Sequence, residues 1–124
     1  MNAKENLEPA RTRPTPPPVP PYYAVVFVST RPRRARDGED DGYATTAARM
    51  VELAQNMPGF LGMDSVRDAA GLGITVSYWR DARAIDNWKE NAEHLDAQRR
   101  GRAGWYEDFT LHIARVERTC RGPA

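Results

Sequence analysis

The chain has 124 residues, which is room for one domain of ordinary size together with a tail. Its 18 Lys and Arg residues nearly balance 17 Asp and Glu residues, so the formal net charge is only +1. This charge gives no electrostatic reason to expect binding to nucleic acid or to an anionic membrane. No apolar run reaches the length of a membrane span, and the N-terminus lacks the apolar region of a signal peptide. The single cysteine, Cys120, excludes an internal disulfide, and we therefore expect a cytoplasmic protein.

The first 21 residues cannot form a hydrophobic core, since they read MNAKENLEPARTRPTPPPVPP and include seven prolines. They predict a disordered tail with polyproline II character over 16–21. A proline-rich ligand for a partner domain is the alternative interpretation. We expect the folded domain to span 22–118, and 119–124 to form a C-terminal tail.

The first half of the domain begins with an apolar run at 22–29, YYAVVFVS, which is typical of a central strand covered on both faces. The charged stretch 30–41 that follows predicts a solvated loop, although its arginines could contact an anionic group. These arginines are Arg31, Arg33, Arg34 and Arg36.

An amphipathic helix is predicted between Tyr43 and Met57, and it ends before Pro58-Gly59. That pair predicts a tight entry into a strand over 60–67, FLGMDSVR. A turn at 68–71 then leads into the next strand, which indicates a hairpin.

The stretch 73–101 carries most of the functional argument. Ile74, Val76 and Tyr78 alternate with Thr75, Ser77 and Trp79, which predicts a strand. Asp81 follows as a helix N-cap. The helix after it has a core-facing stripe, formed by Ile85, Trp88, Ala92 and Leu95. At about 100° per residue, a polar strip edges that stripe, formed by Asn91, His94 and Gln98. We expect this helix to bend or restart around 94–95 and to end in the region 101–104.

The last strand is predicted at 109–116, FTLHIARV, with Phe109, Leu111 and Ile113 on one face and His112 on the other. The order is therefore βαββαβ. Right-handed crossovers turn this order into an α+β fold, a ferredoxin-like antiparallel sheet with both helices on one face. The other face should be apolar, as 22–29 and 109–113 suggest, and burying it between two subunits predicts a homodimer.

The order of elements and three segments of the chain together resemble the antibiotic biosynthesis monooxygenase family. These segments are PGFLGMDSVRD, GITVSYWRD and AIDNWKENAEHLDAQ. The resemblance covers about 22–118 and implies a dimeric α+β barrel with a pocket between the sheet and the helices of each subunit. It also implies oxidation of a small aromatic, quinol or polyketide-type substrate by O₂, without metal or flavin.

The resemblance does not extend to the haem-degrading branch of the family. That branch carries an Asn on its first strand and an axial His about ten residues after the helical Trp. Here the first strand lacks Asn, and the position ten after Trp88 is Gln98, whose amide is a poor haem ligand. No Gly-rich phosphate loop follows the first strand, and no spacing of His, Cys and carboxylates indicates zinc. We expect no cofactor and no metal.

The resemblance and the residue types together give a set of candidate site residues. Trp88, Asn91 and His94 are the candidate catalytic residues, as a ring contact, a donor and a donor or base. Tyr78, Trp79, Trp105 and Tyr106 are the candidate substrate-binding walls.

Each of these residues also has a purely structural interpretation. Trp88 could be core, and Asn91 or His94 could make a surface or interface hydrogen bond. Trp105 and Tyr106 could pack at the dimer contact, and His112 should face the barrel or the dimer interface. The same fold also hosts non-catalytic ligand-binding or interaction proteins, which is the alternative function.

Overall fold

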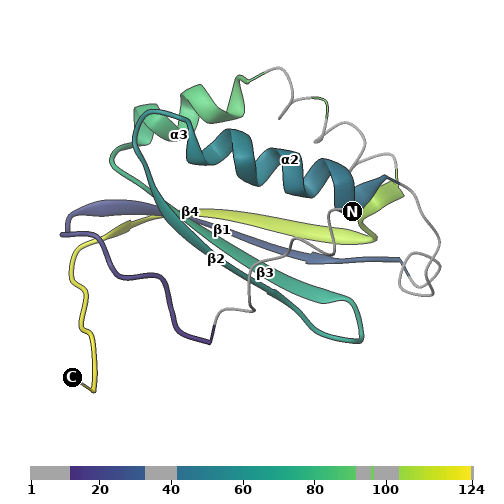
Figure 1. Ribbon diagram of the computed structural model, residues 1–124, viewed down its shortest axis with the longest axis horizontal. Coiled ribbons are helices and arrows are strands. Elements are labelled where there is room, and N and C mark those ends of the chain that lie inside the picture. The colour runs from purple at the N-terminus through teal and green to yellow at the C-terminus, as the bar shows by residue number, and fades with distance from the viewer. Residues whose placement is uncertain (1–11, 33–41, 92–95, 97–103, 124) are drawn as a thin grey trace, which may run out of the picture.

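The structure is a computed structural model, and it describes residues 12–32, 42–91, 96 and 104–123. The elements follow the predicted order, and their bounds are β1 Tyr22–Thr30, α2 Tyr43–Gln55, β2 Phe60–Arg67, β3 Leu72–Trp79, α3 Ala82–Lys89 and β4 Asp108–Val116. The four strands form one antiparallel sheet in the order β2-β3-β1-β4. Figure 1 shows α2 and α3 above this sheet, so the predicted ferredoxin-like α+β fold is confirmed. Among the described residues, no helix is long and apolar enough to span a membrane.

The strand register divides the side chains between a helix face, which α2 and α3 cover, and an open face. In β1, Tyr23 lies opposite Trp79 of β3, and Val25 lies opposite Ser77. These residues are on the helix face, because Tyr23 and Val25 pack against the core formed by Trp79, Ala84 and Ile85. Residues next to them in sequence, such as Tyr22 and Tyr78, therefore point to the open face.

The start of α3 follows from Asp81, as predicted. The Asp81 Oδ1 atom accepts a hydrogen bond from the backbone N–H of Ala84 at 2.8 Å, which satisfies one of the free donors of the first turn. This bond is the main reason why the pKa of Asp81 lies below its usual value. The described part of α3 ends earlier than expected, with Glu90 as its C-cap. Asn91 therefore follows the helix instead of continuing its edge.

The predicted Pro58-Gly59 turn is tightly packed against the beginning of α3. Gly59 has a φ of +85°, and a Cβ atom built on it would lie 2.6 Å from the Cβ of Ala84. Its carbonyl accepts a hydrogen bond from the N–H of Arg80 at 2.8 Å. The turn thus needs glycine both for its left-handed backbone and for the close approach of the helix.

The apolar residues of β4 lie on the helix face, whereas the predicted dimer contact placed them on the face away from the helices. Phe109, Leu111 and Ile113 lie opposite Ser29, Phe27 and Val25 of β1, which places them on the helix face. They are still 40–48% exposed, because β4 is an edge strand. His112 is exposed on the open face, and its predicted place at the barrel or dimer interface stays a prediction. The exposed apolar side chains of the open face are instead Val66, Leu72 and Ile74.

The segment 12–21, for which the sequence predicts disorder, contacts the sheet. The backbone N–H of Thr15 donates to Asp64 Oδ1 at 2.9 Å, and its hydroxyl donates to the Met63 carbonyl at 2.7 Å. Figure 1 shows this segment and the C-terminal residues on the side of the sheet away from the helices. Proline content excludes regular structure here, but it leaves individual polar groups able to bind an edge strand such as β2.

Candidate functional site

Two of the predicted site residues, Trp79 and Trp88, lie together on the helix face. Trp79 at the end of β3 is fully buried, and the half-buried Trp88 of α3 stacks on it with ring centroids 6.2 Å apart and an interplanar angle of 26°. The indole N–H of Trp79 donates to the Ser77 hydroxyl at 2.9 Å, which fixes the orientation of that ring. Trp79 is thus a core residue that supports Trp88, which packs against the core and is partly exposed.

The polar strip predicted beside Trp88 is described only at its first position. Asn91 is half-buried, and its backbone N–H donates to the Trp88 carbonyl at 3.1 Å, which holds it one turn beyond the indole. His94 and Gln98 lie outside the described residues. Their part in a site stays a prediction.

A second aromatic cluster on the helix face includes the other two predicted wall residues, Trp105 and Tyr106. Both rings meet the ring of Tyr43 from α2 edge to face, each with centroids 5.6 Å apart. Tyr106 also contacts Phe27 of β1 at 5.2 Å and Phe109 of β4 at 6.2 Å. The segment before β4 is thus joined to α2 and to the sheet through aromatic contacts.

Two arginines that the sequence analysis did not assign to a site border this aromatic cluster. Arg31, which was predicted to lie in a solvated loop, is only 7% exposed, so that prediction is wrong for this residue. Its guanidinium lies 3.9 Å from the centre of the Tyr43 ring and donates to the Trp105 carbonyl at 2.6 Å. Burial of an arginine requires such partners, and they come from parts of the chain that local sequence does not bring together.

Arg67 at the end of β2 is the second arginine, and its hydrogen bonds are to neutral acceptors. It donates to the carbonyl and the hydroxyl of Ser29 at 3.1 and 2.8 Å, and to the Gly71 carbonyl at 2.6 Å. Its guanidinium lies over Gly73, where an added Cβ would be 2.5 Å from Cζ. The alternation of β2 could have indicated this position, because it puts residue 67 on the same face as Met63.

The electrostatics of this cluster keep Tyr106 protonated. Burial raises the pKa of Tyr106 well above its usual value, and a hydrogen bond with Tyr43 acts in the same direction. Arg67 and Arg31 oppose this shift with their positive charges. A neutral phenol in a positive field can donate a hydrogen bond to an anion, but it is a poor base at neutral pH.

Tyr78 is not brought together with the other predicted site residues, because it follows the open face. Its hydroxyl donates to Asp64 Oδ2 at 3.0 Å, and its ring meets Tyr22 edge to face at 5.8 Å. Neighbouring strand residues point to opposite faces, so Tyr78 and Trp79 cannot line the same side of one sheet. The partners described for Asp64 include the Tyr78 hydroxyl and the Thr15 N–H.

The helix face therefore offers aromatic rings and two guanidinium groups from described residues. No group of three His, Cys, Asp or Glu side chains that could hold a metal occurs in the part of the chain that the structure describes. The arrangement fits binding of a flat organic molecule and stabilisation of negative charge on it.

Comparison with known proteins gives matches over most of the chain. The sequence profile of the family described as "Antibiotic biosynthesis monooxygenase" matches residues 25–100. The Bacillus subtilis (strain 168) "Uncharacterized protein YqjZ" is 50% identical over 101 residues, which cover 82% of this chain and 84% of that protein. The "Jasmonate monooxygenase ABM" of Pyricularia oryzae is 31% identical over 101 residues. That match covers 80% of this chain but only 45% of the fungal protein.

Solved structures with low sequence identity have the same fold. SnoaB from Streptomyces nogalater, described as a cofactor-independent oxygenase, has a TM-score of 0.66 at 16% identity, with 81% of this chain and 97% of that chain covered. Rv0793 from Mycobacterium tuberculosis has a TM-score of 0.68 at 13% identity, with 81% and 99% covered. Similarity at this level of identity concerns the fold alone.

Proposed function

Because the chain belongs to the antibiotic biosynthesis monooxygenase family, we propose that it is a cofactor-independent monooxygenase that oxidises a small electron-rich aromatic, quinol or polyketide-type molecule with O₂. The observation that carries the proposal is the family match over 25–100, which includes Trp79, Trp88, Asn91 and His94. The names of two similar proteins, a jasmonate monooxygenase and a cofactor-independent oxygenase, support the reaction type.

The proposed reaction needs no external reductant. A phenol that becomes a quinone loses two hydrogens and gains one oxygen atom, and the second atom of O₂ leaves as water. All four electrons that reduce O₂ come from the substrate. Removal of the phenolic proton makes the ring electron-rich enough to pass the first electron. The protein must therefore bind the ring, accept the proton, stabilise the anion and exclude bulk water.

We assign the contact with the substrate ring to Trp88, and the hydrogen-bonding and proton-transfer roles to Asn91 and His94. The indole of Trp88 rests on the buried Trp79, so a substrate ring against its outer face would meet a rigid wall. Asn91 would donate its amide to the substrate oxygen, and His94 would take the proton or donate to the anion.

The second aromatic cluster would supply the opposite wall and part of the charge stabilisation. Tyr106, whose pKa is raised by burial, would serve as a neutral donor, and Trp105 would limit the space beside it. The positive charges of Arg31 and Arg67 would favour an anionic over a neutral substrate. This assignment predicts that phenols with a lower pKa are turned over at lower pH.

We also propose that the protein is a homodimer that buries part of the open face. Val66 is 73% exposed, Leu72 48% and Ile74 41%, and the three lie on neighbouring strands. A monomer would leave this apolar surface in water, and a two-fold contact would remove it.

Oxygen consumption tests the proposed function directly. Purified full-length protein is mixed with a panel of quinols, anthrones and polyhydroxylated aromatics, and O₂ uptake is compared with a sample inactivated by heat. With ¹⁸O₂, one labelled atom should appear in the product and one in water. The alternative, a non-catalytic ligand-binding protein of the same fold, predicts saturable binding of an aromatic ligand with no uptake above background. Uptake without label in the product would contradict a monooxygenase reaction.

A further inference from the structure

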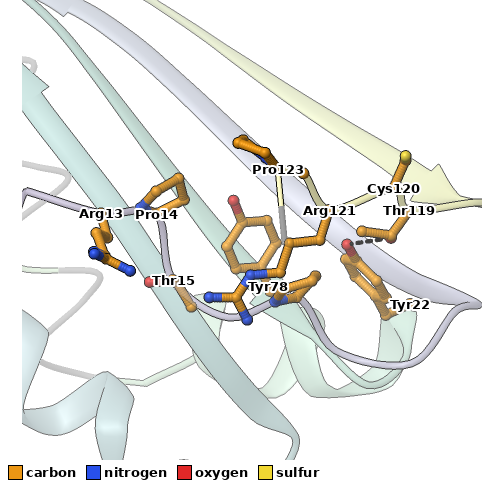
Figure 2. Close-up of a pocket in the computed structure, with 11 residues that line it drawn as sticks. Arg13, Pro14, Thr15, Tyr22, Tyr78, Thr119, Cys120, Arg121 and Pro123 are labelled. Atoms are coloured by element: carbon orange, nitrogen blue, oxygen red, sulfur yellow. Dashed lines mark hydrogen bonds between the residues drawn. The ribbon is translucent and has the colours of Figure 1, made fainter.

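A cavity of about 610 Å³ lies on the open face, between the two ends of the described chain (Figure 2). Tyr78 lines it, so the cavity is on the other side of the sheet from Trp79. Its floor is formed by Tyr22 of β1 and Tyr78 of β3, and its walls come from both ends of the described chain, 13–17 and 119–123. The volume is within the range of about 300–1,000 Å³ that is usual for small-molecule sites. The cavity is therefore large enough for a ligand with one or two rings.

Each wall of the cavity is attached to the sheet by hydrogen bonds. Thr15 binds β2 through its N–H and its hydroxyl, at 2.9 Å to Asp64 Oδ1 and 2.7 Å to the Met63 carbonyl. On the other side, the hydroxyls of Thr119 and Tyr22 are 2.9 Å apart, and Figure 2 shows this bond. The two terminal segments are thus held at definite places on the open face.

The two charged side chains that line this cavity are both arginines. Arg13 comes from the N-terminal wall and Arg121 from the C-terminal wall, and no Asp or Glu is among the residues that line the cavity. Neither guanidinium has a hydrogen-bond or ion-pair partner in the part of the chain that the structure describes. Asp64 lies behind this lining, where its carboxylate accepts from the Thr15 N–H and the Tyr78 hydroxyl. The two exposed guanidinium groups thus outnumber the carboxylate beside them, and they can give an anionic ligand charge-assisted hydrogen bonds.

The floor of the cavity is aromatic, and its hydroxyl groups are already paired. The Tyr78 hydroxyl donates to Asp64 Oδ2 at 3.0 Å, and the Tyr22 hydroxyl is paired with Thr119. The rings meet edge to face at an interplanar angle of 87°, and Tyr22 is only 4% exposed. Tyr78 is therefore the ring that a ligand can contact, and this contact favours an apolar or aromatic body.

We propose that this cavity binds a small aromatic carboxylate, with its carboxylate between Arg13 and Arg121 and its ring against Tyr78. Such a ligand would join the two terminal segments to each other across the open face. The exposed apolar residues Val66 and Leu72 lie near the opposite ends of the strands, so the proposed dimer contact is compatible with a ligand here. The proposal does not depend on the oxygenase reaction.

Binding of 1-naphthoate to the full-length protein tests the proposal, with 1-naphthalenemethanol as the uncharged control and inorganic phosphate as the anion without a ring. Calorimetry gives the affinities, and amide chemical shifts locate the site. We expect saturable naphthoate binding below about 1 mM and shifts at Thr15, Thr119 and Arg121. R13Q and R121Q should each weaken binding about tenfold or more, because each removes a charge-assisted contact. Arg49→Gln, on the outer side of α2, removes the same charge elsewhere and should leave binding unchanged.

Four results of the affinity measurements would overturn the proposal. These are the absence of saturable naphthoate binding, equal affinity for the alcohol, equal affinity for phosphate, and equal effects of R49Q and R121Q. Shifts confined to the indole N–H groups of Trp79 and Trp88 would place the ligand on the helix face and would equally exclude the open-face cavity. The substituted arginines are on the surface, so folding of the variants can be checked by circular dichroism before binding is measured.

Discussion

Replacing Gly59 with Ala should destabilise the protein through two separate effects. The φ of +85° puts residue 59 in the left-handed region, which costs an L-residue about 1–2 kcal/mol. The new Cβ would also lie 2.6 Å from the Cβ of Ala84, which is too close for two carbon atoms, so α3 or the turn must shift. Such overpacking typically costs about 1–3 kcal/mol. We therefore expect G59A to lower the free energy of unfolding by about 2–5 kcal/mol.

Gly42 provides a matched control for the backbone term. Its φ of +81° is nearly the same, but a Cβ on Gly42 would have no atom within 4 Å. Gly42→Ala should therefore cost only the backbone term, about 1–2 kcal/mol. A domain of this size loses roughly 4–8 °C in Tm for each kcal/mol, so the two variants should be separated by several degrees.

Thermal and urea unfolding of both variants, followed by circular dichroism, measure this difference. The double variant G59A/A84G removes the methyl group that the new Cβ meets. It should lose less stability than the sum of its single changes, by about 1–2 kcal/mol. Equal losses for G59A and G42A, or strict additivity in the double variant, would refute the close approach of the Pro58-Gly59 turn to α3.

The remaining predictions concern the cap, the site, the assembly, the cofactor and the tail. The pKa of Asp81 is lowered in the folded state, so its contribution to stability is present above its unfolded pKa and is lost as pH falls through the folded value. The stability difference between wild type and D81N should therefore shrink between pH 7 and pH 3 in urea unfolding, and a constant difference would contradict the cap. Asn91→Ala and His94→Ala should each lower turnover about 10²-fold with little change in Tm. Trp88→Ala should also lower the free energy of unfolding by about 2–4 kcal/mol. Full activity of the first two variants would exclude both residues from the site. Light scattering should give the mass of a dimer at micromolar concentration, and a stable monomer would contradict burial of the open face. Purified protein should show no Soret band and no activation by flavin or iron, and stoichiometric haem binding would contradict the argument from sequence. Removal of residues 1–21 should change the free energy of unfolding by less than about 1 kcal/mol, because ordering the segment offsets most of its hydrogen bonding; a larger loss would make it part of the folded domain.

Much of the fold could be predicted from the sequence because its signals are local. A continuous apolar run predicted β1, the Pro58-Gly59 pair predicted the start of β2, and alternation predicted β3 and β4. A helical period predicted α2 and the first turns of α3. Asp81 and Pro58-Gly59 are short-range signals, and each has the predicted role in the structure. The same alternation already implies that Tyr78 and Trp79 point to opposite faces, although the prediction of one pocket had grouped them.

The candidate site depends on contacts between distant parts of the chain, and only the tertiary structure decides these. Arg31 is buried against the Trp105 carbonyl, which lies 74 residues away, and nothing in the sequence near Arg31 distinguishes it from the other arginines of 30–41. Thr15 binds Met63 across 48 residues, so composition alone predicted a tail without contacts. The position of a residue in the repeat of its helix or strand fixes the face on which its side chain lies. The partners on that face come from elements that are brought together only when the whole chain folds, and these partners decide burial, charge and the shape of a cavity.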